Sequence, residues 1–319
     1  MSKILVTGGC GFIGSNYIDY KLLSDASVKV VCVDSLDIGG LEDNISEWSR
    51  DGGRYKMYNG NICNPERMGE IFDWEEPDIV VNFAAQTHVD RSLKDRTYFA
   101  TTNVVGTQVL LDQAIKHKTK RFLHVSTDEV YGSIDSGLFE ETNMLHPNNP
   151  YSATKAGAEM LVQAAVHSFG VNASITRSSN NYGPRQYHEK LIPMVIHNAL
   201  KGLPVNVFNE GTSIREWIYV LDNVIGIDLV VQKGRRGEVY NIGSGIELQN
   251  IDVVTTILDI LGKPHSLINY TNDRANDDRR YALNTTKMFT HLGWRSKVGW
   301  KEGIQQTVDW YLKNKYEGS

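Results

Sequence analysis

The chain has 319 residues, of which 41% are hydrophobic, so it is long enough for a large domain with an additional lobe and can bury a substantial core. Its formal net charge is −5, with acidic and basic residues interspersed, which argues against nucleic acid or an anionic membrane as a partner. No hydrophobic run approaches the ~18 residues of a membrane span.

The N-terminal residues and the cysteines favour a cytoplasmic protein. Residues 1–9 lead directly into an expected strand and a glycine turn, so we expect no signal peptide. The three cysteines, Cys10, Cys32 and Cys63, lack the spacing of a metal-ligand set. Their odd number favours reduced thiols. We therefore predict a cytoplasmic location and no metal site.

Short runs of β-branched residues alternate with helical patterns in the first half of the chain. Helical patterns include Ile13–Leu23 and Asn103–His117. The alternation predicts an α/β fold of the Rossmann type, a doubly wound parallel sheet. The expected strands are Lys3–Thr7, Lys29–Asp34, Arg54–Asn59, Ile79–Phe83, Phe122–Ser126 and Ala173–Arg177.

The alternation becomes less regular after Arg177. Residues 179–222 are rich in Asn, Gly, Pro and charge, whereas Val224–Gln232 is again helical in pattern. Further on, we expect a helix at Ile251–Leu261, a polar loop at Asn272–Arg280 and a last helix ending near Lys313. We therefore predict a nucleotide-binding domain at 1–178, to which the chain returns at about 223–243. A smaller α/β substrate-binding lobe would comprise 179–222 and 244–319.

A glycine-rich turn follows the first expected strand and opens a helix. Gly8, Gly11 and Gly14 allow a sharp turn and a close approach of the backbone to a pyrophosphate, beside the helix N–H groups of Phe12 and Ile13. Asp34 ends the second strand, where a carboxylate can bind ribose hydroxyls and repel a 2′-phosphate. The motif predicts NAD rather than NADP as cofactor.

Two further strand ends are candidate cofactor contacts. Asn61 and Ile62 follow the third strand, where an adenine edge could be bound. Phe83, Ala84 and Ala85 end the fourth strand, and the two small side chains would let a dinucleotide cross the sheet edge. Ordinary packing at strand ends explains both segments equally well.

Tyr151 and Lys155 are four residues apart, so on one helix they share a face. Pro150 directly before them is consistent with the first turn of a helix. A free tyrosine, with a pKa of about 10, is a poor base at neutral pH, and a nearby ammonium would favour its phenolate. Such a phenolate can take a hydroxyl proton while NAD accepts hydride from the same carbon.

Thr127, Asp128 and Glu129 follow the expected strand that ends at Ser126. Two adjacent carboxyls are commonly a solvated turn. Here they come at the carboxyl end of a parallel strand, where ligands of open α/β sheets bind. Burial there could separate the two pKa values and give one acid and one base. Thr127 could bind a sugar hydroxyl or the Tyr151 oxygen.

With these motifs, the chain resembles the extended short-chain dehydrogenase/reductase family, and within it the dTDP-glucose 4,6-dehydratases. The Thr-Asp-Glu triplet discriminates best, because related epimerases and decarboxylases do not usually carry the acidic pair. The similar segments are the glycine turn, Ala85–Ser92, Ser126–Gly132, Tyr151–Lys155, Asn180–Pro184, Glu189–Pro193, Arg215–Trp217 and Asp273-Arg274.

The resemblance implies a reaction in three parts. Tyr151, assisted by Lys155, takes the 4-hydroxyl proton of a nucleotide-linked glucose while hydride leaves carbon 4 for NAD. Glu129 then removes the proton on carbon 5, and Asp128 protonates the departing 6-hydroxyl. Hydride finally returns to carbon 6, which gives the 4-keto-6-deoxy sugar nucleotide.

The resemblance also implies a set of substrate-binding residues in the lobe. The two arginines would bind the diphosphate, because a guanidinium matches its oxygens. Taken alone, either arginine could equally be a solvated surface charge. The implied set is His88, Asn181, Glu189, Lys190, Leu191, Arg215, Asn250 and Arg274.

Departures from the family pattern leave the nucleotide open. Asn61 stands where relatives commonly have Asp, and Asn209-Glu210-Gly211 replaces a common Gly-Asp-Gly. The loop from Asp273 to Asp278 lacks a Gly-His pair, and similar loops occur in UDP-glucose dehydratases. The substrate could thus be dTDP-glucose, UDP-glucose or another nucleotide hexose.

Alternatives to the dehydratase remain at this stage. An NAD-dependent sugar-nucleotide 4-epimerase or decarboxylase would need the Tyr-Lys pair but not the acidic pair. A protein that only senses a dinucleotide, without turnover, would need neither the Tyr-Lys pair nor the acidic pair. The resemblance further implies a homodimer, with Asn103–His117 and Ser152–Phe169 as candidate contact helices. Packing on the sheet explains the hydrophobic stripes of those helices as well.

Overall fold

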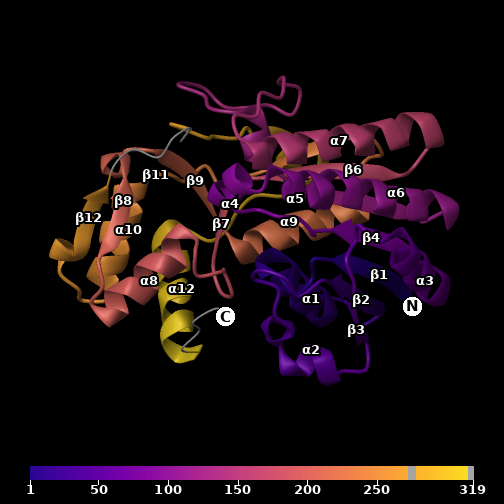
Figure 1. Ribbon diagram of the computed structural model, residues 1–319, viewed down its shortest axis with the longest axis horizontal. Helices are drawn as coiled ribbons and strands as arrows, with labels where there is room; N and C mark the ends of the chain where they lie inside the picture. Colours follow the sequence, from indigo (N-terminus) through magenta and orange to yellow (C-terminus); the bar gives the residue numbers. More distant parts are fainter. Residues whose placement is uncertain (272–277, 315–319) are drawn as a thin grey trace.

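A parallel sheet forms the larger part of the molecule. The computed structural model describes residues 1–271 and 278–314. Seven strands pair in the order β10-β6-β5-β4-β1-β2-β3, and each neighbouring pair is parallel (Figure 1). The order reverses direction beside β1, and ligands of such sheets bind at this switch point. The strands are β1 (Ser2–Thr7), β2 (Val28–Asp34), β3 (Tyr55–Asn59), β4 (Ile79–Asn82), β5 (Arg121–Thr127), β6 (Ala173–Ser178) and β10 (Val239–Ile242).

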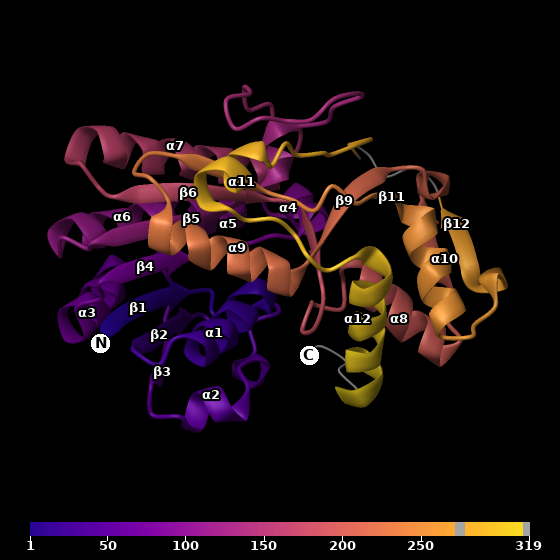
Figure 2. The ribbon, with the colours of Figure 1, turned by 180° about the vertical axis from the view of Figure 1, so that it is seen from behind.

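Helices cover both faces of this sheet because its strands are hydrophobic on both sides. In β1, Ile4 and Val6 belong to one buried cluster and Leu5 to the other, as the alternation of a strand requires. Figure 2 shows α9 and α11 across one face. That face carries α1 (Phe12–Ser24), α9 (Val220–Lys233) and α11 (Thr286–Leu292), and the opposite face carries α3 (Pro65–Glu75), α6 (Gly106–Lys116) and α7 (Pro150–Phe169).

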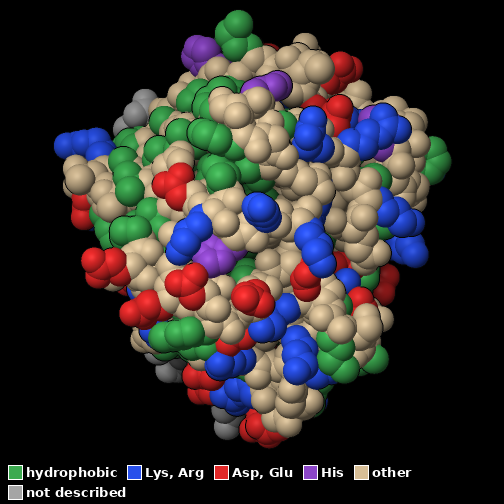
Figure 3. All heavy atoms as spheres, turned by 90° about the vertical axis from the view of Figure 1, so that its right-hand side faces the viewer, with side chains coloured by type: hydrophobic (Ala, Val, Ile, Leu, Met, Phe, Trp, Pro, Cys, Tyr) green, Lys and Arg blue, Asp and Glu red, His purple; other side chains and the backbone are tan. Residues whose placement is uncertain are grey.

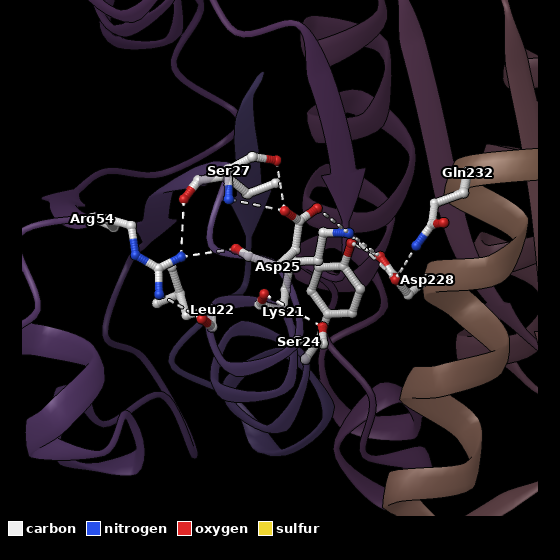
Figure 4. A network of polar contacts seen from close by, with 10 residues as sticks. Lys21, Leu22, Ser24, Asp25, Ser27, Arg54, Asp228 and Gln232 are labelled. Carbon is white, nitrogen blue, oxygen red and sulfur yellow. Dashed lines mark hydrogen bonds and ion pairs between the residues drawn. The ribbon is translucent and has the colours of Figure 1, made fainter. Parts of the chain in front are cut away.

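A buried polar network joins α1 to α9. Asp228 of α9 is 2% exposed, and its carboxylate lies 3.1 Å from the ammonium of Lys21 of α1 (Figure 4). The Tyr17 hydroxyl donates to the same carboxylate. Asp25 lies 3.4 Å from Lys21 on its other side. The helix that opens after the glycine turn is thereby fixed to the helix beside it.

The remaining elements form a smaller part with its own core, at the left of Figure 1. Its strands form a three-stranded sheet, β11-β9-β7, and a parallel pair, β12-β8. Hydrophobic residues of α8, α10 and α12 pack against them. The elements are β7 (Asn180–Tyr182), α8 (Leu191–Lys201), β8 (Val205–Phe208), β9 (Ile214–Tyr219), β11 (Glu247–Gln249), α10 (Asn250–Ile260), β12 (Ile268–Thr271) and α12 (Trp300–Asn314).

Short elements complete the described chain. Between α5 and α6 the helix contains a π-helical turn, η2 (Thr101–Val105), where Asn103 donates to the Gln86 carbonyl and to the Thr154 hydroxyl. Turns of this kind often occur near functional sites. The other short elements are η1 (Glu42–Asn44), α2 (Glu47–Asp51), α4 (Val89–Lys94), α5 (Arg96–Ala100), η3 (Asp128–Tyr131), η4 (Asn209–Gly211) and η5 (His265–Leu267).

The predicted fold class is confirmed, and the six expected strands are present with bounds shifted by at most a few residues. The first residues of the helix expected at Asn103–His117 lie instead in the π-helical turn, where the Asn103 side chain donates to the Gln86 carbonyl. The segment 179–222 is more regular than its composition indicates, since it contains α8 and three strands. The exact domain boundaries stay a prediction.

Candidate active site

Two adjoining cavities lie at the carboxyl ends of the sheet strands. One, of about 310 Å³, extends from the glycine turn after β1 to the ends of β4 and β5. The other, of about 250 Å³, lies between that edge and the smaller part. The two cavities share five lining residues, so their contents would meet there. The shared residues are Glu129, Asn180, Asn181, Gln186 and Lys190.

The glycine turn has a shape that only glycine allows. Gly8 has φ +67°, and a Cβ there would lie 2.6 Å from the Ala84 nitrogen. A Cβ on Gly14 would lie 2.3 Å from the Gly8 oxygen. Gly11 precedes α1 and supplies no side-chain cap, so the helix's first N–H groups, including those of Phe12 and Ile13, face the cavity without a capping side chain. This arrangement suits a pyrophosphate.

The predicted cofactor residues all line the larger cavity. Asp34 ends β2, and its carboxylate accepts hydrogen bonds from the backbone of Cys10 and Leu36, each at 2.9 Å. Burial raises the pKa of Asp34, although these bonds oppose the shift. The fixed carboxylate stands where a 2′-phosphate would be repelled. The other residues at this wall are Asn61, Ile62, Phe83, Ala84 and Ala85.

Buried polar atoms around the cavities support a polar ligand. Within the described chain, Ser126 Oγ, Ser179 Oγ, Asn180 Oδ1 and Asn181 Oδ1 are buried and have no protein hydrogen-bond partner. All four residues line the larger cavity. Unsatisfied buried groups are uncommon, and a dinucleotide with its ribose and amide groups would satisfy them. This set of hydroxyl groups and amide oxygens therefore fits NAD.

Tyr151 and Lys155 lie in the first turns of α7 and line the larger cavity, as predicted. The Lys155 ammonium donates to the Val125 carbonyl at 2.7 Å and lies 3.5 Å from His124 Nε2. Burial lowers the pKa of Lys155 to about 8, although the Glu159 carboxylate acts in the opposite direction. Its ammonium is thus held by the end of β5 rather than by the phenol.

The surroundings of the Tyr151 phenol disfavour its ionised form, which is the form that acts as a base. Burial raises its pKa, and the charges of Glu129 and Asp128 raise it further. A hydrogen bond with the Thr127 hydroxyl acts in the opposite direction. A positive charge beside the phenol would lower this pKa. That Lys155 supplies this charge stays a prediction, and one of the three N–H groups of its ammonium donates to the Val125 carbonyl.

Asp128 and Glu129 lie in η3, the turn directly after β5, and both line the larger cavity. Asp128 is 2% exposed. Burial raises its pKa well above the ordinary value, and the charges of Glu129 and Glu216 add to the shift. Within the described residues, its Oδ2 has no protein hydrogen-bond partner. The surroundings of Asp128 thus favour its protonated form, which can act as a proton donor.

Glu129 has a more favourable environment for its ionised form. Burial raises its pKa, but the cations Lys190 and Arg215 and a hydrogen bond from Asn149 oppose the shift. Asp128 has a hydrogen bond from Thr127 and the charge of Arg215, with two carboxylates near it. The surroundings therefore favour the ionised form of Glu129 more than that of Asp128, a difference that acid–base catalysis can use.

The predicted substrate residues line the smaller cavity where the structure describes them. Glu189 also bonds with the Arg91 guanidinium, through Nε at 3.1 Å, and lies 3.4 Å from His88 Nε2. Its carboxylate is therefore already engaged. Arg274 lies outside the described residues. The lining members are His88, Asn181, Glu189, Lys190, Leu191, Arg215 and Asn250.

The structure adds three residues that the sequence did not single out for this cavity. Asn149 caps α7 and donates to Glu129. The Trp217 indole N–H is buried without a protein partner in the described chain, as is Oδ1 of Asn250, which the sequence already predicts. Tyr281 lies under the Arg215 guanidinium, 4.8 Å from it. Asn149 before Pro150 is a readable capping signal, whereas the other two depend on tertiary contacts.

Within residues 1–271 and 278–314, no group of three or more His, Cys, Asp or Glu side chains could hold a metal ion. In the same part of the chain, no helix has the length and hydrophobicity to cross a membrane.

Comparison with known proteins agrees with this site. The model of the GDP-mannose 4,6 dehydratase family matches residues 5–307. A dTDP-glucose 4,6-dehydratase of Actinoplanes sp. is 44% identical over 318 residues, covering 98% of each chain. The low-salt glycan biosynthesis protein Agl12 of Haloferax volcanii is 45% identical, covering 97% of this chain and 98% of that one.

Solved structures show the same fold. The dTDP-glucose 4,6-dehydratase DesIV of Streptomyces venezuelae, with NAD and TYD bound, has a TM-score of 0.94 and is 40% identical, covering 98% of each chain. A UDP-glucose 4-epimerase of Thermotoga maritima has a TM-score of 0.91 and is 32% identical, covering 98% of this chain and 100% of that one. The chain therefore belongs to the GDP-mannose 4,6 dehydratase family, within the extended short-chain dehydrogenases/reductases.

Proposed function

We propose that the chain catalyses the NAD-dependent dehydration of dTDP-glucose to dTDP-4-keto-6-deoxyglucose. The observation that carries the proposal is the acidic pair after β5: Asp128 and Glu129 line the larger cavity together with Tyr151, Asp128 is buried, and Glu129 lines both cavities. When bound, NAD supplies the acceptor for hydride from carbon 4 of the sugar and its donor to carbon 6. The protein supplies proton transfers and binding.

Tyr151 takes the proton of the 4-hydroxyl in the oxidation. Its phenol needs help to ionise, since burial and two carboxylates raise its pKa. Thr127 assists through its hydrogen bond to the phenol oxygen. Lys155, fixed by the Val125 carbonyl, supports the same end of α7. Loss of the 4-hydroxyl proton and of hydride from carbon 4 gives a ketone there.

Elimination then uses the acidic pair. The ketone acidifies the proton on carbon 5, which the ionised Glu129 removes. The protonated Asp128 donates its proton to the 6-hydroxyl oxygen, the bond between that oxygen and carbon 6 breaks, and water leaves. Hydride is then added at carbon 6, and carbon 5 regains a proton. Each proton lost in the sequence is matched by one gained.

The acidic pair also decides against the alternative activity. A 4-epimerase needs a base for the 4-hydroxyl but no acid for a departing 6-hydroxyl. The epimerase of Thermotoga maritima shares the fold, so the fold does not separate the two reactions. Burial of the Asp128 carboxyl, whose Oδ2 has no protein partner within the described residues, costs stability. Dehydration uses this carboxyl.

We choose dTDP-glucose on the strength of the relatives named for that substrate, which cover nearly the whole chain. UDP-glucose is the competitor, because the two nucleotides differ in the base by one methyl group. Such a group usually contributes only ~1–3 kcal/mol to discrimination. Competition between the two substrates, followed by mass spectrometry, measures the preference directly.

Mass spectrometry of the product tests the function itself. Purified protein incubated with dTDP-glucose and NAD should give a product lighter by one water, with no net NADH. An isomer of the same mass would indicate an epimerase instead. Unchanged substrate under conditions in which NAD binds would refute both activities.

The proposal includes a homodimer formed through α6 and α7. Val105 of η2, directly before α6, is 49% exposed, and Met160 and Phe169 of α7 are exposed by 53% and 67%. Hydrophobic side chains gather in the upper part of the face shown in Figure 3, where Figure 1 places α6 and α7. A second copy of these helices would cover such a surface. We keep the cytoplasmic location as a prediction from the cysteines.

A further inference from the structure

Asn149 contacts two parts of the site with one side-chain amide. The residue is 7% exposed and directly precedes α7. Its Oδ1 accepts a hydrogen bond from the Ser152 backbone at 2.9 Å, and its own backbone N–H donates to Ser152 Oγ at 3.3 Å. This reciprocal cap fixes the start of the helix that carries Tyr151 and Lys155.

The cap also fixes which way the amide points. A backbone N–H must be met by the oxygen of the amide, so the nitrogen of Asn149 must face the other side. There Nδ2 lies 3.4 Å from Glu129 Oε2. The orientation of the donor is therefore set by the helix and not by the cavity. Such a contact can shorten when substrate is bound.

An amide N–H directed at a carboxyl favours the ionised form. The charges around Glu129 do not all act in the same direction. Lys190 and Arg215 favour its ionised form, whereas Asp278 opposes it. Glu129 also interacts unfavourably with ionised forms of neighbouring groups. These groups are Asp128, Tyr151 and Tyr281.

Among the residues that the structure describes, no comparable amide donates to Asp128. Its Oδ1 accepts from the Thr127 hydroxyl at 3.2 Å, and its Oδ2 has no protein partner within the described residues. The amide of Asn149 is thus one neutral group that distinguishes the two neighbouring acids. It distinguishes them in the direction that elimination requires.

We propose that Asn149 is a positioning residue that holds the Glu129 carboxylate as the proton acceptor for carbon 5 and ties it to the start of α7. The inference depends on the proposed dehydration, because the proton on carbon 5 becomes acidic only after carbon 4 is oxidised. It assigns to this residue a role in catalysis beyond helix capping.

Two substitutions separate capping from positioning. Asn149→Ser and Asn149→Asp both keep an oxygen that can cap α7, and both remove the amide donor. Exchange of the carbon 5 proton with D2O requires oxidation at carbon 4 and the base, but not the acid that releases the 6-hydroxyl. We expect the Ser variant to exchange about five-fold more slowly at neutral pH, the value of one ordinary hydrogen bond. The acidic limb of the kcat/KM profile should move upward in pH.

The Asp variant sharpens the test. It should cap α7 well, because a carboxylate is favourable at a helix N-terminus. It also places a further negative charge beside Glu129, so its acidic limb should move further than that of the Ser variant. A normal unfolding temperature together with a displaced limb would support positioning.

Ser152→Ala is the matched control. It removes the other half of the reciprocal cap and leaves the Asn149 amide and Glu129 in place. We expect a lower unfolding temperature and an unmoved acidic limb. If both Asn149 variants keep the parent's limb and exchange rate, the residue is only a cap and the inference is wrong. A parent enzyme that releases no water would instead overturn the proposed function.

Discussion

The two cavities of this protein are built in different ways. The cofactor cavity is formed by a contiguous glycine turn and by the ends of adjacent parallel strands, so its shape comes mainly from the backbone. The substrate cavity takes side chains from α4, β8, β9 and α10 and from the residues after 277, which are far apart in the sequence. The first depends on local geometry, whereas the second depends on tertiary packing.

The two catalytic carboxyls, Asp128 and Glu129, depend on both kinds of construction. Asp128 and Glu129 follow a central strand, so the backbone of the sheet positions them. Their pKa values, however, are adjusted by groups of the substrate side, such as Lys190, Arg215 and Glu216. The proposed reaction thus takes place where the cofactor cavity, shaped by the backbone, adjoins the substrate cavity, shaped by side chains.

Replacing Asp128 by Asn tests the acid at the place where the two cavities adjoin. It should have the largest effect on the rate of dehydration. Without a proton donor for the 6-hydroxyl, we expect elimination to slow by about 10²- to 10⁴-fold, the usual contribution of a general acid. Binding of NAD and of substrate should persist, as calorimetry can measure. Exchange at carbon 5 should also persist, because Glu129 remains.

The reciprocal variant, Glu129→Gln, should lose exchange at carbon 5 and water release together. Elimination at the parent rate in Asp128→Asn would show that the acid role is wrong. The two variants together distinguish an acid and a base from a pair of carboxylates that only bind sugar.

Replacing Gly8 by Ala tests the backbone-built cavity. The residue has φ +67°, and the new methyl group would lie 2.6 Å from the Ala84 nitrogen, so the wall must move. We expect NAD affinity to fall by about 100-fold, equivalent to strain of ~3 kcal/mol. Gly53→Ala is the control, since Gly53 also has φ +67° but no atom lies within 4 Å of the new Cβ. Equal losses of NAD affinity in both variants would show that the wall is not the cause.

The sequence predicts the backbone-built cavity better than the other. Glycine spacing after a strand, Asp34 at the next strand end, and the four-residue spacing of Tyr151 and Lys155 are local patterns, and the structure brings these residues to one cavity. Their detailed contacts are not local. The bond of Lys155 to the Val125 carbonyl depends on how α7 packs against β5, which no spacing in the sequence reveals.

The substrate cavity needed the family resemblance. Nothing in the pattern around Arg215 or Asn250 alone separates a ligand contact from a surface side chain. Trp217 and Tyr281 were missed because their importance comes from burial beside partners distant in sequence. Helix α8 was missed as well, since Pro193 lies within it and the residues before it are polar, which obscures its hydrophobic pattern.

Substituting Glu189 by Gln tests the side-chain-built cavity. Glu189, which lines this cavity, joins the segment before α8 to Arg91 of α4. The pair is 36% and 29% exposed, so we expect a loss of about five-fold in kcat/KM for the sugar nucleotide, with NAD affinity unchanged. The loss should shrink at high salt, since the screened pair contributes less there.

Glu247→Gln is the matched control for that experiment. Glu247 pairs with Arg280 through two oxygens at similar exposure, 30% for the glutamate. Its loss should leave kcat/KM near the parent value. If Glu189→Gln impaired NAD binding as strongly as sugar binding, the two cavities would not be separable in this way.

The smallest effect should come from Glu75, at the far side of the cofactor half. Burial alone would raise its pKa, but hydrogen bonds from Lys56, Tyr58 and Lys3 lower it to about 2. The carboxylate thereby links α3 to β1 and β3. Because the folded-state pKa lies below the unfolded one, the stabilisation is complete above the ordinary pKa of glutamate and is lost as the pH falls toward 2.

We therefore expect Glu75→Gln to lower the free energy of unfolding by about 1 kcal/mol at pH 7, a value limited by the exposure of Lys56. The difference from the parent should narrow below pH ~4.5. Urea unfolding at pH 7 and pH 3 measures this difference in the free energy of unfolding. The control Glu70→Gln removes an exposed pair with Arg67 and should change the free energy of unfolding very little at either pH. Because Glu75 lies outside both cavities, kcat should not change. A gap of equal size at both pH values would mean that packing, and not the charge of Glu75, stabilises this end of the sheet.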